Sequence, residues 1–243
     1  TGGFGLSGAS LGGTTYGSVT NPTALGSGAK YNATTFANGG GAVMVRVTGA
    51  VTNHGSITAN GVNSPGTTGG GAGGSIYLTA ATLSGSGAIR ANGGNGAAGQ
   101  NAGGGGGGRV AVVLSGGDFS AFPTTNIVAY GGYVAAGDKE PGAGGTVYLK
   151  SSSQPYGSLI VANSNLLTSA QTLITNMTVR FDSIAVTNRG VLAVGADATL
   201  DLTGCALSGD NNTAAAAANI GGRIVFGLPG STITWPNPFT NTV

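Results

Sequence analysis

Residues 69–96 read GGGAGGSIYLTAATLSGSGAIRANGGNG, and much of the remaining chain repeats this pattern. The stretch begins with glycines, continues into a short alternating strand, turns through small residues, and ends in a second strand followed by more glycines. Short strands bounded by glycine and serine turns are typical of β-structure. The sequence therefore predicts many short strands joined by long glycine-rich connections.

Two markers recur along the chain with similar spacing. The first strand returns with an apolar residue after glycines at Val43, Ile76, Val110 and Val147, which are 33, 34 and 37 residues apart. The second strand returns at Ile57, Ile89, Ile127 and Ile160, which are 32, 38 and 33 residues apart. A period in the thirties indicates a stacked array, in which each repeat buries its apolar face against the next.

We expect an all-β fold, a right-handed parallel β-helix with glycine-rich excursions. Each marker would form an apolar column inside the stack, and Asn60, Asn92 and Asn163 would hydrogen-bond along one corner. An outward column is apolar where water is expected, at Met44, Tyr77, Ala111 and Tyr148. Either the excursions at 61–74 and 93–108 or another chain would cover this face. We favour the excursions, which would pack on one another as extended polyglycine-like segments.

One domain is expected over residues 1–243. Residues 1–40 predict an N-terminal wrap or cap, residues 41–163 the glycine-interrupted repeats, and residues 164–243 tighter rungs with a C-terminal cap. Only the alanine run at 214–218 suggests helix, of one or two turns. The abrupt start at Thr1 suggests a segment of something longer.

Composition excludes several classes of protein. Glycine makes up 50 of 243 residues, but there is no strict Gly-X-Y period and proline numbers only eight, so the chain is not collagen. Hydrophobic residues reach 40%, which is too many for a disordered chain. The net charge is only +2 and the basic residues are not clustered, so the sequence shows no surface for binding nucleic acid. No apolar run approaches the roughly 18 residues of a membrane span.

The repeats resemble the glycine-rich β-helix repeats of very large secreted and surface proteins of bacteria. The motifs GGGxGGSIxL, GSGxIxANGGNG and GGGGGGRVAV follow one another at residues 69–78, 85–96 and 103–112. Residues 144–150, leading to 159–161, continue the likeness. The resemblance implies an extracellular or envelope-associated β-helix with an adhesive or scaffolding role. It implies no catalytic residue.

Residues of the kinds that enzymes use are few and scattered. His54 is the only histidine, and we expect it at an exposed turn rather than in a triad or a zinc site. Cys205 is the only cysteine, which excludes an internal disulfide, and we interpret it as a small buried thiol. The charged cluster at 138–142 predicts a solvated loop tip. We therefore expect no catalytic residue, no metal and no cofactor.

An enzymatic alternative would use Asp197 and Asp201 as an acidic pair, with Lys150 or Arg180 as the basic partner. Glycosidases place two carboxyl groups about 5 to 9.5 Å apart. Polysaccharide lyases with a β-helix fold, by family resemblance, combine acidic clusters and calcium with a basic residue that removes a proton. The alternative function is thus a carbohydrate-binding or polysaccharide-cleaving β-helix.

The favoured interpretation is a structural or adhesive module of a larger secreted bacterial surface protein. Unpaired strand edges at the ends of a β-helix invite further pairing, so head-to-tail or lateral self-association into filaments is expected. Surface glycans are a second class of partner, and neither nucleic acid nor a membrane span is expected. The candidate contact residues are Met44, Tyr77, Tyr148 and Tyr156.

Overall fold

The computed structural model describes residues 15–30, 34–99, 102–135, 140–175, 177–195 and 197–209, and the backbone of two later strands. This part of the chain is all β, as expected, with one 3-10 turn, η1 (Thr124–Asn126), and no α-helix. None of its elements is a helix with the length and apolarity that crossing a membrane requires. The alanine run at 214–218 lies outside the described residues.

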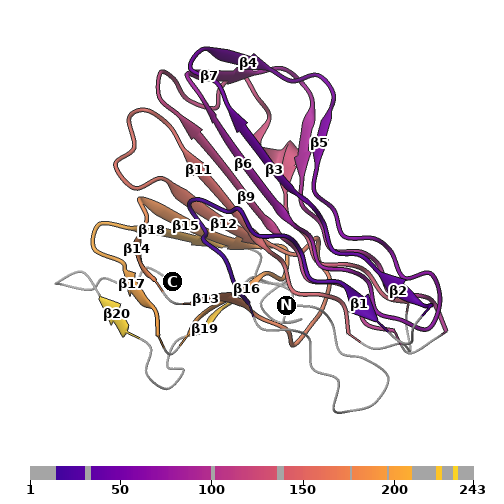
Figure 1. Ribbon diagram of the computed structural model, residues 1–243. Coiled ribbons are helices and arrows are strands. Elements are labelled where there is room, and N and C mark those ends of the chain that lie inside the picture. The colour runs from indigo at the N-terminus through magenta and orange to yellow at the C-terminus, as the bar shows by residue number, and fades with distance from the viewer. Residues whose placement is uncertain are drawn as a thin grey trace.

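The first repeats build three sheets of parallel strands around one apolar core (Figure 1). The widest sheet receives the first strand of each repeat: β3 (Ala42–Arg46), β6 (Ser75–Ala80), β9 (Arg109–Leu114) and β11 (Thr146–Lys150). A second sheet pairs β4 (Ala50–Thr52) with β7 (Thr82–Ser84). The third aligns β5 (Ser56–Thr58), β8 (Ala88–Arg90) and β10 (Ile127–Val128).

The first apolar column is confirmed, because the strands of the widest sheet align at Val43, Ile76, Val110 and Val147. The second column aligns Ile57, Ile89 and Ile127 in the third sheet but ends there. The expectation that Ile160 continues this column is wrong.

Ile160 lies in β12 (Ser158–Ala162), which pairs antiparallel with β11 and places Ile160 beside Val147. The cause is the short connection at 151–157. It has no middle strand and folds as a turn, in which the Gln154 N–H donates to the Ser151 carbonyl at 3.2 Å and Gly157 adopts φ +73°. The chain therefore returns beside β11 instead of crossing to another sheet.

After this reversal the strands again recur in three sheets of parallel strands. β12, β15 (Ser183–Thr187) and β18 (Ala206–Gly209) extend the widest sheet, giving seven strands in the order β18-β15-β12-β11-β9-β6-β3. A second set comprises β13 (Thr172–Ile174), β16 (Val191–Val194) and β19 (Arg223–Val225). The third comprises β14 (Thr178–Arg180), β17 (Thr199–Asp201) and β20 (Thr232–Thr234).

The two halves bury their apolar residues on opposite faces of the seven-stranded sheet. Val147 and Leu149 of β11 belong to the first core, whereas Tyr148, between them, belongs to the second. Leu159 pairs with Tyr148 and also belongs to the second core. Successive side chains of a strand point to opposite faces, so β11 contributes to both cores.

The glycine-rich segments stack on one another beyond the starts of the strands of the widest sheet (Figure 1). The segment 103–108 shows the pattern most clearly. The N–H groups of Gly104 and Gly107 donate to residues 140 and 143, and those of Gly105 and Gly108 donate to residues 94 and 91. Donors three apart thus point the same way, as in a polyproline II-type helix with three residues per turn. The expected polyglycine-like packing is confirmed.

Asparagine side chains bridge successive rungs beside these segments. Asn60 Oδ1 accepts from the Asn92 N–H at 2.8 Å, and Asn92 Oδ1 accepts from the Tyr130 N–H at 2.8 Å. Asn163, expected in the same ladder, instead accepts from the Gly131 N–H at 2.9 Å. In each bond a side-chain oxygen accepts from a backbone N–H. A second ladder runs beside the first, in which Asn63 accepts from the Asn95 N–H and Asn95 accepts from the Tyr133 N–H.

The N-terminal wrap, not the glycine segments, covers part of the outward column. Residues 15–28 cross the widest sheet, where the Ser75 hydroxyl donates to the Ala24 carbonyl at 2.6 Å and Val19 is fully buried in the same core as Ala111. The wrap then forms an antiparallel pair, β1 (Ala29–Lys30) with β2 (Phe36–Ala37). The expected covering of Ala111 by glycine excursions is therefore wrong.

The glycine packing predicts a sharp positional effect of alanine. A Cβ added at Gly105 would lie 2.0 Å from the Gly71 carbonyl oxygen, so Gly105→Ala should destabilise the fold by more than about 3 kcal/mol. Gly49→Ala is the matched control, because no atom lies within 4 Å of its added Cβ. Urea unfolding checks both variants, and equal midpoints would contradict the close packing.

Candidate functional site

The four candidate contact residues do not form one open surface. Met44 is 50% exposed and Tyr156 is 40% exposed, but Tyr148 is only 5% exposed and Tyr77 is partly buried. The Tyr148 ring lies 6.1 Å from that of Phe181, and its hydroxyl donates to the Tyr156 carbonyl at 2.9 Å. Desolvation raises the pKa of Tyr148 to about 12. Tyr148 therefore acts in the core of the second half.

Tyr156 belongs to a polar cluster at the turn between the two halves. The Arg180 guanidinium lies over the Tyr156 ring at 4.5 Å, and its Nε lies 3.8 Å from Asp201 Oδ2. The Asp182 carboxylate accepts from the N–H groups of Tyr156 and Gly157 at 3.0 and 2.7 Å. These contacts fix the turn that reverses the chain.

The residues of the enzymatic alternative have structural partners. Arg180 and Asp201 do come together, but Arg180 also donates to the Thr203 carbonyl at 2.8 Å. The Lys150 ammonium donates to the Pro155 carbonyl at 2.7 Å, within the same turn. A hydrogen bond from Thr203 lowers the pKa of Asp201, whereas a general acid needs a raised pKa. The cluster thus contains an Arg180–Asp201 ion pair, but the pKa of its acid is shifted in the direction opposite to that of a general acid.

His54 and Cys205 show no catalytic arrangement. His54 is exposed at a turn, as predicted, with Nδ1 at 3.2 Å from the Ser86 hydroxyl. Cys205 is half-buried rather than fully buried, and desolvation, followed by the nearby Asp182 carboxylate, raises the pKa of its thiol to about 11. Within the described ranges, no group of three His, Cys, Asp or Glu side chains could hold a metal ion.

The charged cluster at 138–142 predicts a solvated loop tip, but the Glu140 carboxylate is held by hydrogen bonds. This carboxylate accepts from the Ser169 N–H and hydroxyl at 2.7 and 2.6 Å and from the Thr168 hydroxyl at 3.2 Å. These bonds fasten the last glycine segment to the loop before β13. Residues 138 and 139 of the cluster lie outside the described part.

The open first rung, β3 with β4 and β5, is one of the ends at which the sequence predicts unpaired strand edges. In the described part of the chain no strand pairs with its outer edge. Its inward residues are only partly buried: Val43, Val45, Val51 and Ile57. Their neighbours one rung further in are at most 1% exposed: Ile76, Leu78, Leu83 and Ile89. The first rung is therefore the end of the three sheets and of the first core among the described residues, and it still exposes part of its apolar side chains.

Comparisons with protein-family models, curated proteins and solved structures gave no match. The open rung and the turn cluster are therefore interpreted from their own geometry.

The Glu140 bonds predict an acid-sensitive contact. Desolvation would raise the pKa of Glu140, but the hydrogen bonds from Ser169 and Thr168 outweigh it and lower the pKa. This stabilisation is therefore complete above the unfolded-state pKa of about 4.3 and is lost as pH falls through the lower folded-state pKa.

Glu140→Gln should lower the free energy of unfolding by about 1 to 2 kcal/mol at neutral pH. It should also make this free energy fall less steeply as the pH is lowered. Unfolding free energies measured from pH 7 downward test it. Asp118→Asn is a milder control, because the Asp118 carboxylate is exposed and accepts from Ser120, two residues away. Unchanged stability of Glu140→Gln at every pH would contradict the role of Glu140.

Proposed function

We propose that this chain is a structural module of an extracellular bacterial surface protein, a β-helix that joins further copies through its open first rung. The observation that carries the proposal is that rung, whose three strands have no partner on their outer edge among the described residues and whose apolar residues are only partly buried. Free strand edges pair with other chains unless they are blocked. The resemblance of the repeats to those of large secreted and surface proteins supports the location.

The switch of core between the two halves supports a closed right-handed coil. Connections between parallel strands are almost always right-handed. β12 runs opposite to β11, yet later rungs add in the same direction along the sheet. For the coil to stay right-handed after β12, the connections between its strands must lie on the other face of the seven-stranded sheet. The two cores do lie on opposite faces of this sheet. The fold is thus two right-handed stacks that share one sheet.

The open rung suits a second copy related by a two-fold axis. An axis normal to the sheet, running beside Met44 at the outer edge of β3, pairs β3 antiparallel with its copy and sets Val43 beside the partner's Val45. Both valines belong to the first core, so the core continues across the contact. The same axis brings β4 to the partner's β5, where their central apolar residues, Val51 and Ile57, coincide. Such an interface is isologous.

Head-to-tail stacking suits the rung less well. The other end of the widest sheet is β18, which runs opposite to β3 and borders the second core. Translation of a copy along the sheet would pair β3 with β18 but leave the two cores on opposite faces. The head-to-head dimer is therefore the unit of assembly, and filaments require a further contact at the β18 end.

Sedimentation velocity over a wide concentration range tests the assembly. The wild-type chain should form a dimer whose population rises with concentration. Met44→Lys should leave a folded monomer, because Met44 is half exposed and two lysines would face each other across the axis. Leu207→Lys on β18, where Leu207 is 44% exposed, should leave the dimer intact.

Three outcomes would contradict the head-to-head dimer. A wild-type monomer at all concentrations would mean that another segment of the protein covers the rung. Loss of association in both lysine variants would indicate head-to-tail stacking. A dimer that withstands Met44→Lys would place the contact elsewhere.

A further inference from the structure

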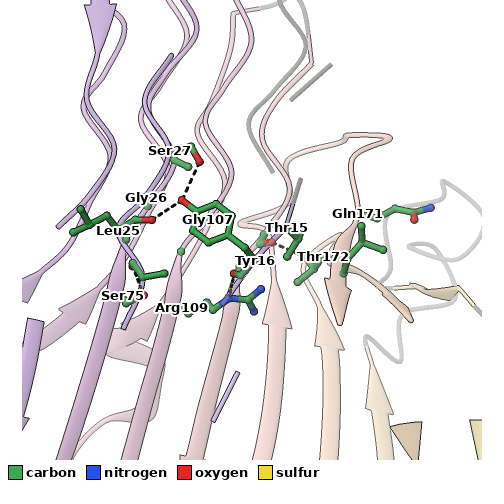
Figure 2. A pocket seen from close by; sticks show the side chains of 18 residues that line it. Thr15, Tyr16, Leu25, Gly26, Ser27, Ser75, Gly107, Arg109, Gln171 and Thr172 are labelled. Carbon is green, nitrogen blue, oxygen red and sulfur yellow. Dashed lines mark hydrogen bonds between the residues drawn. The ribbon is translucent and has the colours of Figure 1, made fainter. Parts of the chain in front are cut away.

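A row of polar residues begins three neighbouring strands of the widest sheet. Ser75, Arg109 and Thr146 are the first residues of β6, β9 and β11 and lie in register. They alternate with Ile76, Val110 and Val147 of the first core, so they point to the opposite face. The N-terminal wrap crosses this face, and Figure 2 shows the Arg109 guanidinium beneath the wrap between Ser75 and Thr172.

Arg109 carries a charge that is almost completely buried, with 8% of its surface exposed. Its Nε donates to the Tyr16 carbonyl at 3.0 Å, and Nη1 lies 3.4 Å from the Thr146 hydroxyl. Desolvation lowers the pKa of Arg109 to about 10, so the guanidinium stays protonated at neutral pH. A guanidinium has five N–H donors, and the contacts among the described residues use two of them.

No carboxylate among the described residues neutralises Arg109. The one ion pair in that part of the chain joins Arg180 to Asp201. Other carboxylates are held by N–H groups elsewhere: Asp118 by Ser120, Glu140 by Ser169, and Asp182 by Gly157. Residues 1–14 contain neither Asp nor Glu. Burying a charge without a partner is costly, which points to an acceptor beyond the residues that the structure describes.

A small pocket adjoins the guanidinium. It has a cavity volume of about 60 Å³ and is walled by the wrap at 24–27, by glycine backbone at 73–74 and 107–108, and by Thr172. Thr15 also lines it, and the buried Thr15 hydroxyl has no hydrogen-bond partner among the described residues. A cation and a hydroxyl without a partner among the described residues thus face one cavity of mixed polarity, whose glycine walls admit a ligand close to the backbone.

We propose that this pocket binds the carboxylate group of a small organic acid, with Arg109 as the charged ligand and the Thr15 hydroxyl as a further donor. Guanidinium and carboxylate match in a planar, two-bond geometry. A water molecule needs about 10 to 15 Å³ of such space, so the pocket holds the few atoms of a carboxylate and its first carbon. The ligand also bridges the wrap to the sheet, because Thr15 and Arg109 belong to different segments.

Thermal unfolding with acetate in place of chloride, at constant ionic strength, tests the site. A ligand that binds only the folded state raises Tm with its concentration. Wild-type protein should show this rise, and saturation-transfer NMR should detect the acetate methyl group. Arg109→Gln should abolish both signals. Arg90→Gln is the matched control and should keep both, because Arg90 is exposed on β8.

Thr15→Val provides a second variant if Arg109→Gln fails to fold. It should weaken acetate binding at least several-fold while leaving the chloride-buffer Tm unchanged or higher, since it removes a buried unpartnered hydroxyl. Equal wild-type Tm in acetate and chloride would overturn the proposal, as would an acetate response that survives Arg109→Gln. A response to sulfate or chloride without one to acetate would also overturn it.

Glucuronate as a second probe distinguishes two sources of the carboxylate. Binding of both acids supports the site and assigns it to the acid group of a sugar. Binding of acetate alone supports the site and limits its ligand to small free acids.

Discussion

The fold depends on close approach between glycine backbones. At Gly94, Gly105 and Gly132 an added Cβ would lie 1.9 to 2.0 Å from a neighbouring carbonyl oxygen, so only glycine permits the observed hydrogen bonds. These bonds hold the returning segments in register, and the register sets where β6, β9 and β11 begin. The same glycine walls also shape the Arg109 pocket. Glycine thus forms a packed region of its own, made of backbone alone and separate from the two apolar cores.

The reversal at 151–157 decides how the rest is arranged. It turns one repeat array into two, because β12 pairs antiparallel with β11 and the second half buries the other face of the sheet. The turn is held by the Asp182 carboxylate and by Arg180 stacked on Tyr156. Three of the charged residues that suggested carbohydrate chemistry, Lys150, Arg180 and Asp201, therefore lie where the chain changes direction. The two ends differ as a result, because β3 borders the first core and β18 borders the second.

The sequence was sufficient for the features that depend on periodicity. Columns such as Val43, Ile76 and Val110 follow from spacing alone, and so does the polyglycine-like packing. Ile160 was misplaced because its local motif matches that of Ile89, while its sheet depends on a missing middle strand. Burial of Arg109 under the wrap depends on contacts 93 residues apart, which no local pattern reveals.

Residue-resolved hydrogen exchange of the glycine amides tests the central claim most directly. Amides of buried, hydrogen-bonded backbone exchange only through large unfolding events. We expect the amides of Gly94, Gly105 and Gly107 to be protected to the same degree as those of β9, although they lie outside any strand. Exchange at the rate of an unstructured chain at these glycines, with β9 protected, would contradict it.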